Sequence, residues 1–418
     1  MNWFADARYG MFIHWGLYSC TGGRWKGMET PWVSEWMMSK FRIPREEYKI
    51  LAKSFTGENF DADRWMRIIA GAGMKYLTIT AKHHDGFSMF DTSYDDYNIV
   101  KMTPFGRDPL KELAGAARKY GVKLGFYYSH VQDWNEPGAA GNTWDFAPEE
   151  KTPEAFQAYL DGKVKHQLRE LLTNYGDVAI LWFDMPGSIT NEQAHDLRDF
   201  VRELAPECLV SGRLTYKEKW DFDSLGDNVL PADKCTFPSE GCGTMNESWG
   251  YKPSDHYYRS LPEILKTMAS LVSTNANYLL NVGPDATGAF PEEACQLLEG
   301  TGEFLRKNGE ALYGNGPLPM ISISHQWGNV TCRDENVYFW CFRDPGKLDF
   351  YGIRNEVESA EIIGGVKVPF EQFTREEYEF HRLTLDIPAQ QAFPYIVKVK
   401  CKGIVQCDPY AYGASSRG

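Results

Sequence analysis

The chain has 418 residues, a hydrophobic fraction of 43% and a net charge of −13 at neutral pH. This length fits one large domain followed by a smaller one. The acidic balance, with no cluster of Lys and Arg, argues against a nucleic-acid partner, because phosphate recognition depends on such clusters. No stretch is long and apolar enough to predict a transmembrane helix, so we expect no membrane partner. The sequence leaves the oligomeric state open.

The nine cysteines are scattered along the chain, and none of them forms a CxxC pair. This spacing disfavours a zinc ribbon or a dithiol redox site and favours reduced, structural thiols. The first eight residues lack the basic and then apolar pattern of a signal peptide. We therefore expect a cytoplasmic protein, or a secreted or periplasmic one if a leader precedes this sequence.

Residues 1–312 alternate short apolar segments with amphipathic ones, which is typical of a parallel β/α architecture. The expected strands are Tyr9–His14, Tyr76–Ala81, Lys123–Tyr128, Val178–Asp184, Leu209–Ser211, Thr236–Pro238, Thr244–Trp249 and Tyr278–Val282. The expected helices are Pro44–Phe55, Ala62–Ala72, Pro109–Tyr120, Glu154–Tyr175, Asn191–Leu204, Pro262–Val272 and Pro291–Leu312. About eight strands with intervening helices predict a (β/α)8-like TIM barrel. A doubly wound sheet is the alternative, but no GxGxxG follows any strand.

Single residues mark several helix ends. Asp61 and Asp108 stand where N-caps are expected, and Gly73 and Gly121 stand where two helices should end.

The sequence pattern changes near residue 313. From Ile321 onward it reads as short strands separated by turn residues. These strands are Asn329–Arg333, Val337–Phe342, Leu348–Ile353, Val366–Phe370, Tyr378–Ile387 and Tyr395–Cys401. The pattern predicts a C-terminal antiparallel β-sandwich over residues 313–418, after a catalytic barrel over residues 1–312.

Histidines follow two of the expected strands, at the end of a barrel where catalytic groups gather. His14 ends the first strand, and His83 and His84 follow the second. A single His at such a place is more often structural. A neutral imidazole can donate and accept a hydrogen bond, which suits vicinal hydroxyls, whereas a metal site is the weaker interpretation because adjacent strand residues face opposite sides.

Asp184 ends an almost wholly apolar strand, Val178–Asp184. Burial of a carboxylate in such surroundings is costly unless the group is paired or used in chemistry. A helix cap is the structural alternative, because Pro186, Gly187 and an expected helix follow. Trp182 lies two residues earlier and therefore shares the face of Asp184.

The chain resembles the α-L-fucosidases of glycoside hydrolase family 29 over nearly its whole length. The segments that carry the resemblance are Arg8–Gly16, Ser34–Trp36, Thr78–Phe90, Gly125–Ser129, Leu181–Asp184, Thr244–Tyr251 and Asn277–Pro284. Each segment alone is weak, but their combination in this order is specific. The resemblance implies a barrel with a C-terminal β-sandwich and retaining hydrolysis of α-L-fucosides without a metal or organic cofactor. It also implies a fucosylated oligosaccharide or glycoconjugate as the partner.

By the same resemblance the nucleophile is Asp184 and the acid/base is Glu240, although Ser239 replaces the Trp that usually precedes this Glu. The fucose-binding residues fall on His14, Glu35, Trp36, His83, His84, Tyr128, Trp182 and Arg213, with Tyr127 directly beside Tyr128. A retaining pair needs a second carboxyl group roughly 5 Å from the first. Spacing alone does not choose among the downstream carboxyl groups, which are Glu218, Asp221, Asp223, Asp227, Glu240 and Glu247.

Residues 226–231 and 244–251 resemble the subgroup that prefers branched α-1,3/1,4-linked fucosides. Two other classes stay open at this point. A non-catalytic carbohydrate-binding protein would keep the His and Trp residues but lack a carboxyl pair, and a metal-dependent barrel hydrolase would use His83, His84 and Asp184.

Overall fold

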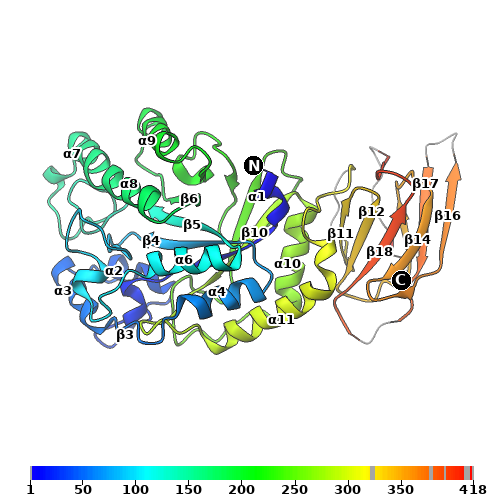
Figure 1. Cartoon of the computed structure of the whole chain (residues 1–418), viewed down its shortest axis with the longest axis horizontal. Helices are drawn as coiled ribbons and strands as arrows, with labels where there is room; N and C mark the ends of the chain where they lie inside the picture. The colour runs from blue at the N-terminus through cyan, green and yellow to red at the C-terminus, as the bar shows by residue number, and fades with distance from the viewer. Residues whose placement is uncertain (1, 321–324, 376–379, 390–391, 409–414, 417–418) are drawn as a thin grey trace.

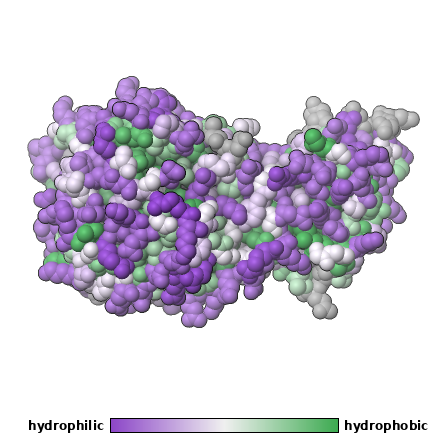
Figure 2. Space-filling view, in the orientation of Figure 1, coloured by the Kyte–Doolittle hydropathy of each residue, from purple (hydrophilic) through white to green (hydrophobic). Residues whose placement is uncertain are grey.

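The structure, a computed structural model, describes residues 2–320, 325–375, 380–389, 392–408 and 415–416. An α/β part, coloured blue to yellow in Figure 1, is followed by an all-β part coloured from dark yellow to red. Figure 2 shows a mainly hydrophilic surface over both parts on the face in view. None of the helices in the described ranges is both long and apolar enough to cross a bilayer.

The α/β part is built on one eight-stranded sheet in which every pair of neighbours is parallel. Its strands are β1 (Tyr9–Ile13), β4 (Tyr76–Lys82), β5 (Lys123–Ser129), β6 (Val178–Asp184), β7 (Leu209–Val210), β8 (Asp223–Ser224), β9 (Ser239–Thr244) and β10 (Ala276–Val282). They run in the order β7-β6-β5-β4-β1-β10-β9-β8. A parallel bridge between Ser211 and Phe222 joins the two outer strands, so the sheet closes on itself. The predicted barrel is confirmed.

Helices cover the outside of this barrel. The longer ones are α4 (Ala62–Gly71), α6 (Pro109–Tyr120), α9 (Asn191–Leu204), α10 (Leu261–Ser273), α11 (Glu292–Asn308) and a consecutive run of α7 (Pro153–Tyr159), the π-helix η5 (Leu160–Val164) and α8 (Lys165–Asn174). The short ones are α1 (Asn2–Ala7), η1 (Leu17–Cys20), η2 (Ser34–Trp36), α2 (Met37–Lys40), α3 (Arg45–Lys49), η3 (Ile50–Ser54), α5 (Ile99–Met102), η4 (Pro148–Glu150), η6 (Gly212–Leu214) and η7 (Gly309–Ala311). A small hairpin pairs β2 (Arg24–Trp25) with β3 (Met28–Glu29).

The predicted caps are present. The side chain of Asp61 accepts a hydrogen bond from the backbone N–H of Arg64, and Asp108 accepts one from Lys111. Gly121 ends α6 at a φ of +67°, a left-handed conformation that favours glycine. Gly73, just after α4, has a φ of +88°.

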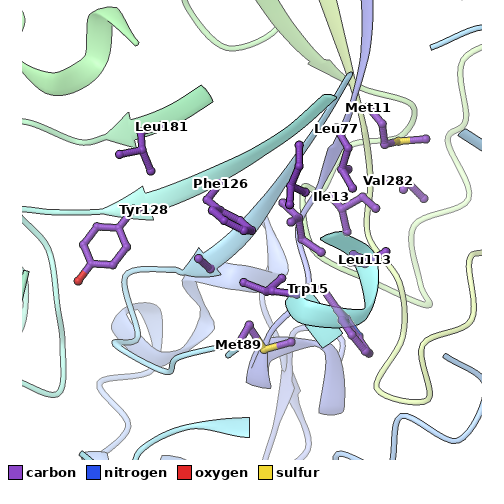
Figure 3. Packing of buried hydrophobic residues seen from close by; sticks show 14 of the residues in the cluster. Met11, Ile13, Trp15, Leu77, Met89, Leu113, Phe126, Tyr128, Leu181 and Val282 are labelled. Carbon is purple, nitrogen blue, oxygen red and sulfur yellow. The ribbon is translucent and has the colours of Figure 1, made fainter. Parts of the chain in front are cut away.

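The alternation of side chains along the strands separates two cores. Outward-facing residues such as Met11, Leu77, Phe126 and Leu181 pack beneath the helices, as Figure 3 shows. Inward-facing residues fill the barrel, and those in contact there include Phe12, Tyr76, Tyr127, Ile180, Trp182, Cys242 and Leu279. Because the period of a strand is two, the register of each strand decides which residues reach the interior.

Two of the predicted barrel strands are wrong. Residues 236–238 and 245–249 do not form strands, and β8 and β9 take their places, with Thr244 as the last residue of β9. The β9 segment SEGCGT lacks the β-branched and aromatic residues that mark a strand. Its glycines instead allow close packing, since a Cβ at Gly241 would lie 2.7 Å from Leu271 of α10.

The C-terminal part consists of two antiparallel sheets, as predicted. One has the order β11-β12-β18-β14-β15 and the other β16-β17-β13-β19. Their strands are β11 (Gly328–Arg333), β12 (Asn336–Cys341), β13 (Lys347–Tyr351), β14 (Val357–Ile362), β15 (Val366–Lys367), β16 (Phe370–Arg375), β17 (Phe380–Asp386), β18 (Tyr395–Cys401) and β19 (Ser415–Ser416). Strands β14 and β19 are additions to the prediction, and the predicted strand Val366–Phe370 is divided between β15 and the first residue of β16. The predicted strand Tyr378–Ile387 begins at residues outside the described ones.

Side chains of both C-terminal sheets meet in one core that contains Phe339, Val397, Phe350 and Leu385. The first sheet also packs on the barrel, where Ser270 of α10 donates a hydrogen bond to Asn329 of β11 at 3.3 Å. The predicted domain boundary at residue 313 lies between η7 and β11.

Candidate active site

A cavity of about 200 Å³ opens at the end of the barrel where β1, β4 and β6 terminate. Its lining residues are Phe12, His14, Trp32, Val33, Glu35, Trp36, His83, His84, Tyr127, Trp182, Asp184, Met185, Arg213, Asp227, Cys242 and Trp249. A larger groove of about 1060 Å³ lies where β5, β6 and β7 begin, among α6, α8 and α9. Barrel enzymes place their chemistry at the C-terminal ends of the strands, so the smaller cavity is the candidate site.

Most of the predicted site residues lie together in this cavity. Asp184 is there with the predicted sugar-binding residues His14, Glu35, Trp36, His83, His84, Trp182 and Arg213. Trp182 lies inside β6, two residues before its end. The others end or follow a barrel strand or lie on a short helix beyond one, such as Arg213 on η6 and Glu35 on η2. Tyr128 and Glu240 do not line the cavity. Tyr127 and Asp227 do.

Asp184 is held by two hydrogen bonds. Tyr127 donates its hydroxyl to Oδ2 at 2.8 Å, and Nη1 of Arg213 donates to Oδ1 at 3.0 Å. Nε2 of His84 lies 3.7 Å from Oδ2. Burial raises the pKa of Asp184, but the charge of Arg213 and the other contacts outweigh it, so the pKa lies below its ordinary value. Asp184 is therefore ionised and able to act as a nucleophile at neutral pH.

The sugar-binding prediction for Tyr128 is not matched by its position. Its hydroxyl donates to Oε1 of Gln167 on α8 at 2.7 Å, and its ring belongs to the core beneath the helices. Tyr127, one residue earlier, faces the barrel interior and stacks on Trp182 at 5.7 Å with an interplanar angle of 19°. Adjacent residues of a strand face opposite sides, so only one of the two tyrosines can reach the cavity.

Two histidines present hydrogen-bond acceptors to the cavity. Nδ1 of His14 lies 2.7 Å from Oδ1 of Asn281, whose amide donates to the carbonyl of Trp249. An amide oxygen only accepts, so Nδ1 of His14 carries the proton and Nε2 is left as an acceptor. His84 follows the same logic, because Nδ1 contacts the Ser129 hydroxyl at 2.7 Å while that hydroxyl donates to Gln132.

Burial keeps these rings neutral. It lowers the pKa of His14 to about 4 and that of His84 to about 4, despite the nearby charge of Asp184. It also lowers the pKa of His83, whose ring stacks on Tyr127 at 5.2 Å. Neutral imidazoles with a free Nε2 are suited to accept hydrogen bonds from sugar hydroxyls.

Glu35 and the tryptophans form another part of the wall. Glu35 is buried, and Oε2 accepts the backbone N–H of Gly250 at 2.9 Å. Burial raises the pKa of Glu35 to about 7. The ring of Trp36 lies 5.0 Å from that of His84 and 5.7 Å from that of Trp32. This wall therefore combines one carboxyl group with broad aromatic faces.

Glu240, predicted as the acid/base, lies inside the barrel below the cavity. Its side chain is fully buried, and it accepts hydrogen bonds from the Tyr76 hydroxyl at 2.5 Å and from the Trp182 indole at 2.9 Å. Trp182 lines the cavity and Glu240 does not. The prediction is corrected on this point: both oxygens of Glu240 accept hydrogen bonds in the barrel interior, and the residue is not part of the cavity wall.

Asp227 provides a carboxylate at the cavity instead. It follows β8, and its side chain is 52% exposed. Its Oδ1 accepts from Nη2 of Arg213, whose Nη1 contacts Asp184. One guanidinium group thus contacts both carboxylates, so Arg213 holds Asp184 and Asp227 at the same cavity. The sequence offered Asp227 only as one of six candidates, since the two-residue strand before it gives no periodic signal.

The neighbourhood of Asp227 is well anchored. Asn228 has a φ of +56°, its N–H donates to the carbonyl of Cys242, and its Oδ1 accepts from the N–H of Thr244. The guanidinium group of Arg213 lies 4.7 Å above the ring of Trp182.

Within the described ranges, no group of three or more His, Cys, Asp and Glu side chains is placed to hold a metal ion.

Comparison with known proteins agrees with this geometry. A family model described as Alpha-L-fucosidase matches residues 1–310. The α-L-fucosidase of Dictyostelium discoideum is 26% identical over 440 residues, which cover 95% of this chain and 91% of that protein. The crystal structure of α-L-fucosidase from Vibrio sp. strain EJY3 superposes with a TM-score of 0.91 at 31% identity, over 97% of this chain and 73% of that one.

A structure with bound product is also similar. Alpha-L-fucosidase AlfC from Lactobacillus casei, in complex with α-L-fucose, is 39% identical with a TM-score of 0.69. The match covers 74% of this chain and 98% of that one.

Proposed function

This chain belongs to the α-L-fucosidase family, glycoside hydrolase family 29, and on that premise we propose that it removes terminal α-L-fucose from glycans with retention of configuration. The observation that carries the proposal is the pair Asp184 and Asp227 at one cavity, bridged by Arg213. Asp184 is the nucleophile of a covalent fucosyl ester. Asp227 is the acid and then the base.

The cavity suits one deoxy sugar. Its volume of about 200 Å³ fits a single ring, and its neutral histidines offer acceptors to hydroxyl groups. Phe12, Trp182 and Trp249 supply apolar surface against the C–H groups of the sugar.

The chemistry then follows in two steps. Asp184 attacks the anomeric carbon while protonated Asp227 gives its proton to the departing glycosidic oxygen. A water molecule next attacks the anomeric carbon of the ester and transfers a proton to the Asp227 carboxylate, and Asp184 is released. Two inversions at the same carbon restore the configuration. Arg213 and the Tyr127 hydroxyl stabilise the ionised form of Asp184 at the start and the end of the cycle.

Glu35 is the second candidate for the acid, because its pKa is raised to about 7 and it lines the same cavity. Position favours Asp227. Glu35 is buried on η2 with one oxygen engaged by Gly250, whereas Asp227 is exposed at the mouth, where a leaving group must depart. We also propose a preference for branched α-1,3/1,4-linked substrates, which rests on residues 226–231, at this mouth, and on residues 244–251.

Azide rescue of alanine variants tests the roles. Asp184→Ala should lose several orders of magnitude in turnover, and azide should give the inverted fucosyl azide. Asp227→Ala should lose about 10²- to 10⁴-fold on a fucosyl disaccharide, much less on a 4-nitrophenyl fucoside, and azide should give the retained product.

Glu35→Ala and Glu240→Gln are the matched controls, and neither should yield a fucosyl azide. Wild-type activity in Asp184→Ala would refute the nucleophile. A retained azide product from Glu35→Ala, with none from Asp227→Ala, would move the acid/base role to Glu35.

A further inference from the structure

Several large apolar side chains are exposed beside the catalytic carboxylates. Tyr216 is 71% exposed and follows Arg213 by three residues. Val229 and Leu230 follow Asp227 by two and three residues on an exposed segment. Trp32, which lines the cavity, is 58% exposed. Exposed apolar groups that gather at one place on a protein generally mark a binding surface.

Tyr216 lies near the charged groups of the cavity, although it is not part of the cavity lining. It follows η6, which carries Arg213. Partial burial raises the pKa of its phenol, the charges of Asp184 and Asp227 add to this rise, and the charge of Arg213 opposes it. The phenol is therefore within electrostatic reach of all three charged groups of the site.

Val229 and Leu230 are held in place by the segment before them. The N–H of Val229 donates to the carbonyl of Gly226 in a turn, and the side chain of Val229 packs over Gly226. Asn228 fixes this turn to β9 through Cys242 and Thr244. The apolar groups are thus presented by an anchored turn, which reduces the entropy lost when a ligand binds.

Trp32 is anchored in a similar way. Its N–H donates to the Thr30 hydroxyl at 3.3 Å, and its carbonyl accepts from Nζ of Lys252 at 3.0 Å. Its ring packs against the ring of Trp36 in the cavity wall. More than half of the Trp32 surface stays open to solvent.

The position of the acid determines what this surface contacts. An acid/base carboxyl must reach the glycosidic oxygen, so the sugar beyond that oxygen lies against the residues around Asp227. The cavity itself holds only one ring. We propose that Trp32, Tyr216, Val229 and Leu230 form the leaving-group subsite and bind the apolar C–H face of a neutral hexopyranose.

This inference rests on the proposed function and adds the chemistry of the leaving group. A flat aromatic or branched aliphatic surface binds the C–H face of a pyranose by burying it, without need for a charge. Selectivity at this subsite therefore depends on which face of the second sugar is apolar.

Substrates with and without a second sugar separate this subsite from the catalytic site. Tyr216→Ala, Leu230→Ser and the double variant should be assayed on a fucosyl disaccharide with a neutral hexopyranose leaving group and on α-L-fucosyl fluoride. Each single substitution should lower kcat/KM on the disaccharide about 3- to 10-fold more than on the fluoride, and the double variant should lose more. Tyr216→Phe should keep the wild-type ratio, because it keeps the ring.

Ile404→Ala, a change of an exposed residue in the C-terminal part, is the matched control and should leave both substrates unaffected. Equal losses on the two substrates, or no loss on the disaccharide, would overturn the subsite. Failure of the wild-type protein to hydrolyse α-L-fucosyl fluoride would instead refute the proposed function. Thermal unfolding of each variant verifies that a loss reflects binding rather than misfolding.

Discussion

The buried carboxyl group of Glu240 makes a quantitative prediction about stability and pH. Burial raises its pKa to about 7 in the folded protein, against 4.5 for an ordinary glutamate. Below pH 4.5 the group is protonated in both the folded and unfolded states, so it adds no pH dependence to the free energy of unfolding. Between pH 4.5 and 7 the folded state holds a proton that the unfolded state releases, so this group's contribution to stability falls as pH rises.

The size of the effect follows from the pKa difference. A difference of one pKa unit between the folded and unfolded states corresponds to about 1.4 kcal/mol, so ionisation of Glu240 should lower the free energy of unfolding by about 3 kcal/mol once the pH is above 7. Glu240→Gln keeps the shape of the side chain and cannot ionise. Its oxygen can still accept from the Trp182 indole, and its amide can donate to the Tyr76 hydroxyl if that hydroxyl turns to accept.

Urea unfolding of the wild type and of Glu240→Gln at pH 5 and pH 8 measures this difference. Other titrating groups, such as His14 and Glu35, are common to both proteins and cancel. From pH 5 to pH 8, the free energy of unfolding of the variant should rise relative to that of the wild type by up to about 3 kcal/mol. Glu58→Gln removes one exposed charge and serves as the control. Equal pH dependence in the wild type and the Glu240→Gln variant would refute the reasoning.

Two paired substitutions test other features of the structure. Tyr127→Phe removes a hydroxyl donor from Asp184, so the pKa of that carboxyl group should rise. The acid limb of the kcat/KM profile should then move to higher pH, and activity should fall about tenfold. Tyr128→Phe loses only a hydrogen bond to Gln167 and should keep the wild-type pH profile. Gly121→Ala should lower the free energy of unfolding by about 1 kcal/mol, because the φ of this residue is +67° and strain, not a clash, opposes the new side chain. Gly115 lies inside the same helix and also has open space around it, so Gly115→Ala should raise the free energy of unfolding by about 0.5–1 kcal/mol. An acid limb that moves equally in both tyrosine variants, or glycine substitutions that shift the urea midpoint in the same direction, would contradict these assignments.

Helices and the apolar strands were predictable because their signals are local. Asn191–Leu204 and Pro109–Tyr120 carry their own caps and apolar periodicity, and the structure reproduces both ranges. The strand Val178–Asp184 is equally clear, because seven residues with a nearly continuous apolar character can only be buried. Strands β8 and β9 carry no such signal, since one has two residues and the other consists largely of small ones.

The choice between Tyr127 and Tyr128 shows what local signals do not contain. Both side chains are buried, so hydrophobicity does not distinguish them. Which one faces the interior depends on the register of β5 against β6, where Tyr127 pairs with Trp182. Trp182 shares a face with Asp184, so the same register brings the hydroxyl of Tyr127 to the nucleophile. Pairing between strands is a long-range property, and the resemblance of one short segment to a family does not fix it.

The position of a strand boundary decides between Glu240 and Asp227 as the second carboxyl group. If residues 236–238 were the strand, Glu240 would follow its C-terminal end, at the face where barrel enzymes place their chemistry. The strand runs instead from Ser239 to Thr244, so Glu240 lies four residues before its end, roughly 13 Å below the rim at about 3.3 Å per residue. Asp227 follows the end of β8 by three residues and therefore reaches the cavity. A difference of a few residues in the bounds of one strand, whose sequence predicts it poorly, thus moves a carboxyl group from the mouth of the barrel to its interior. The residue type alone does not indicate which of the two positions Glu240 takes.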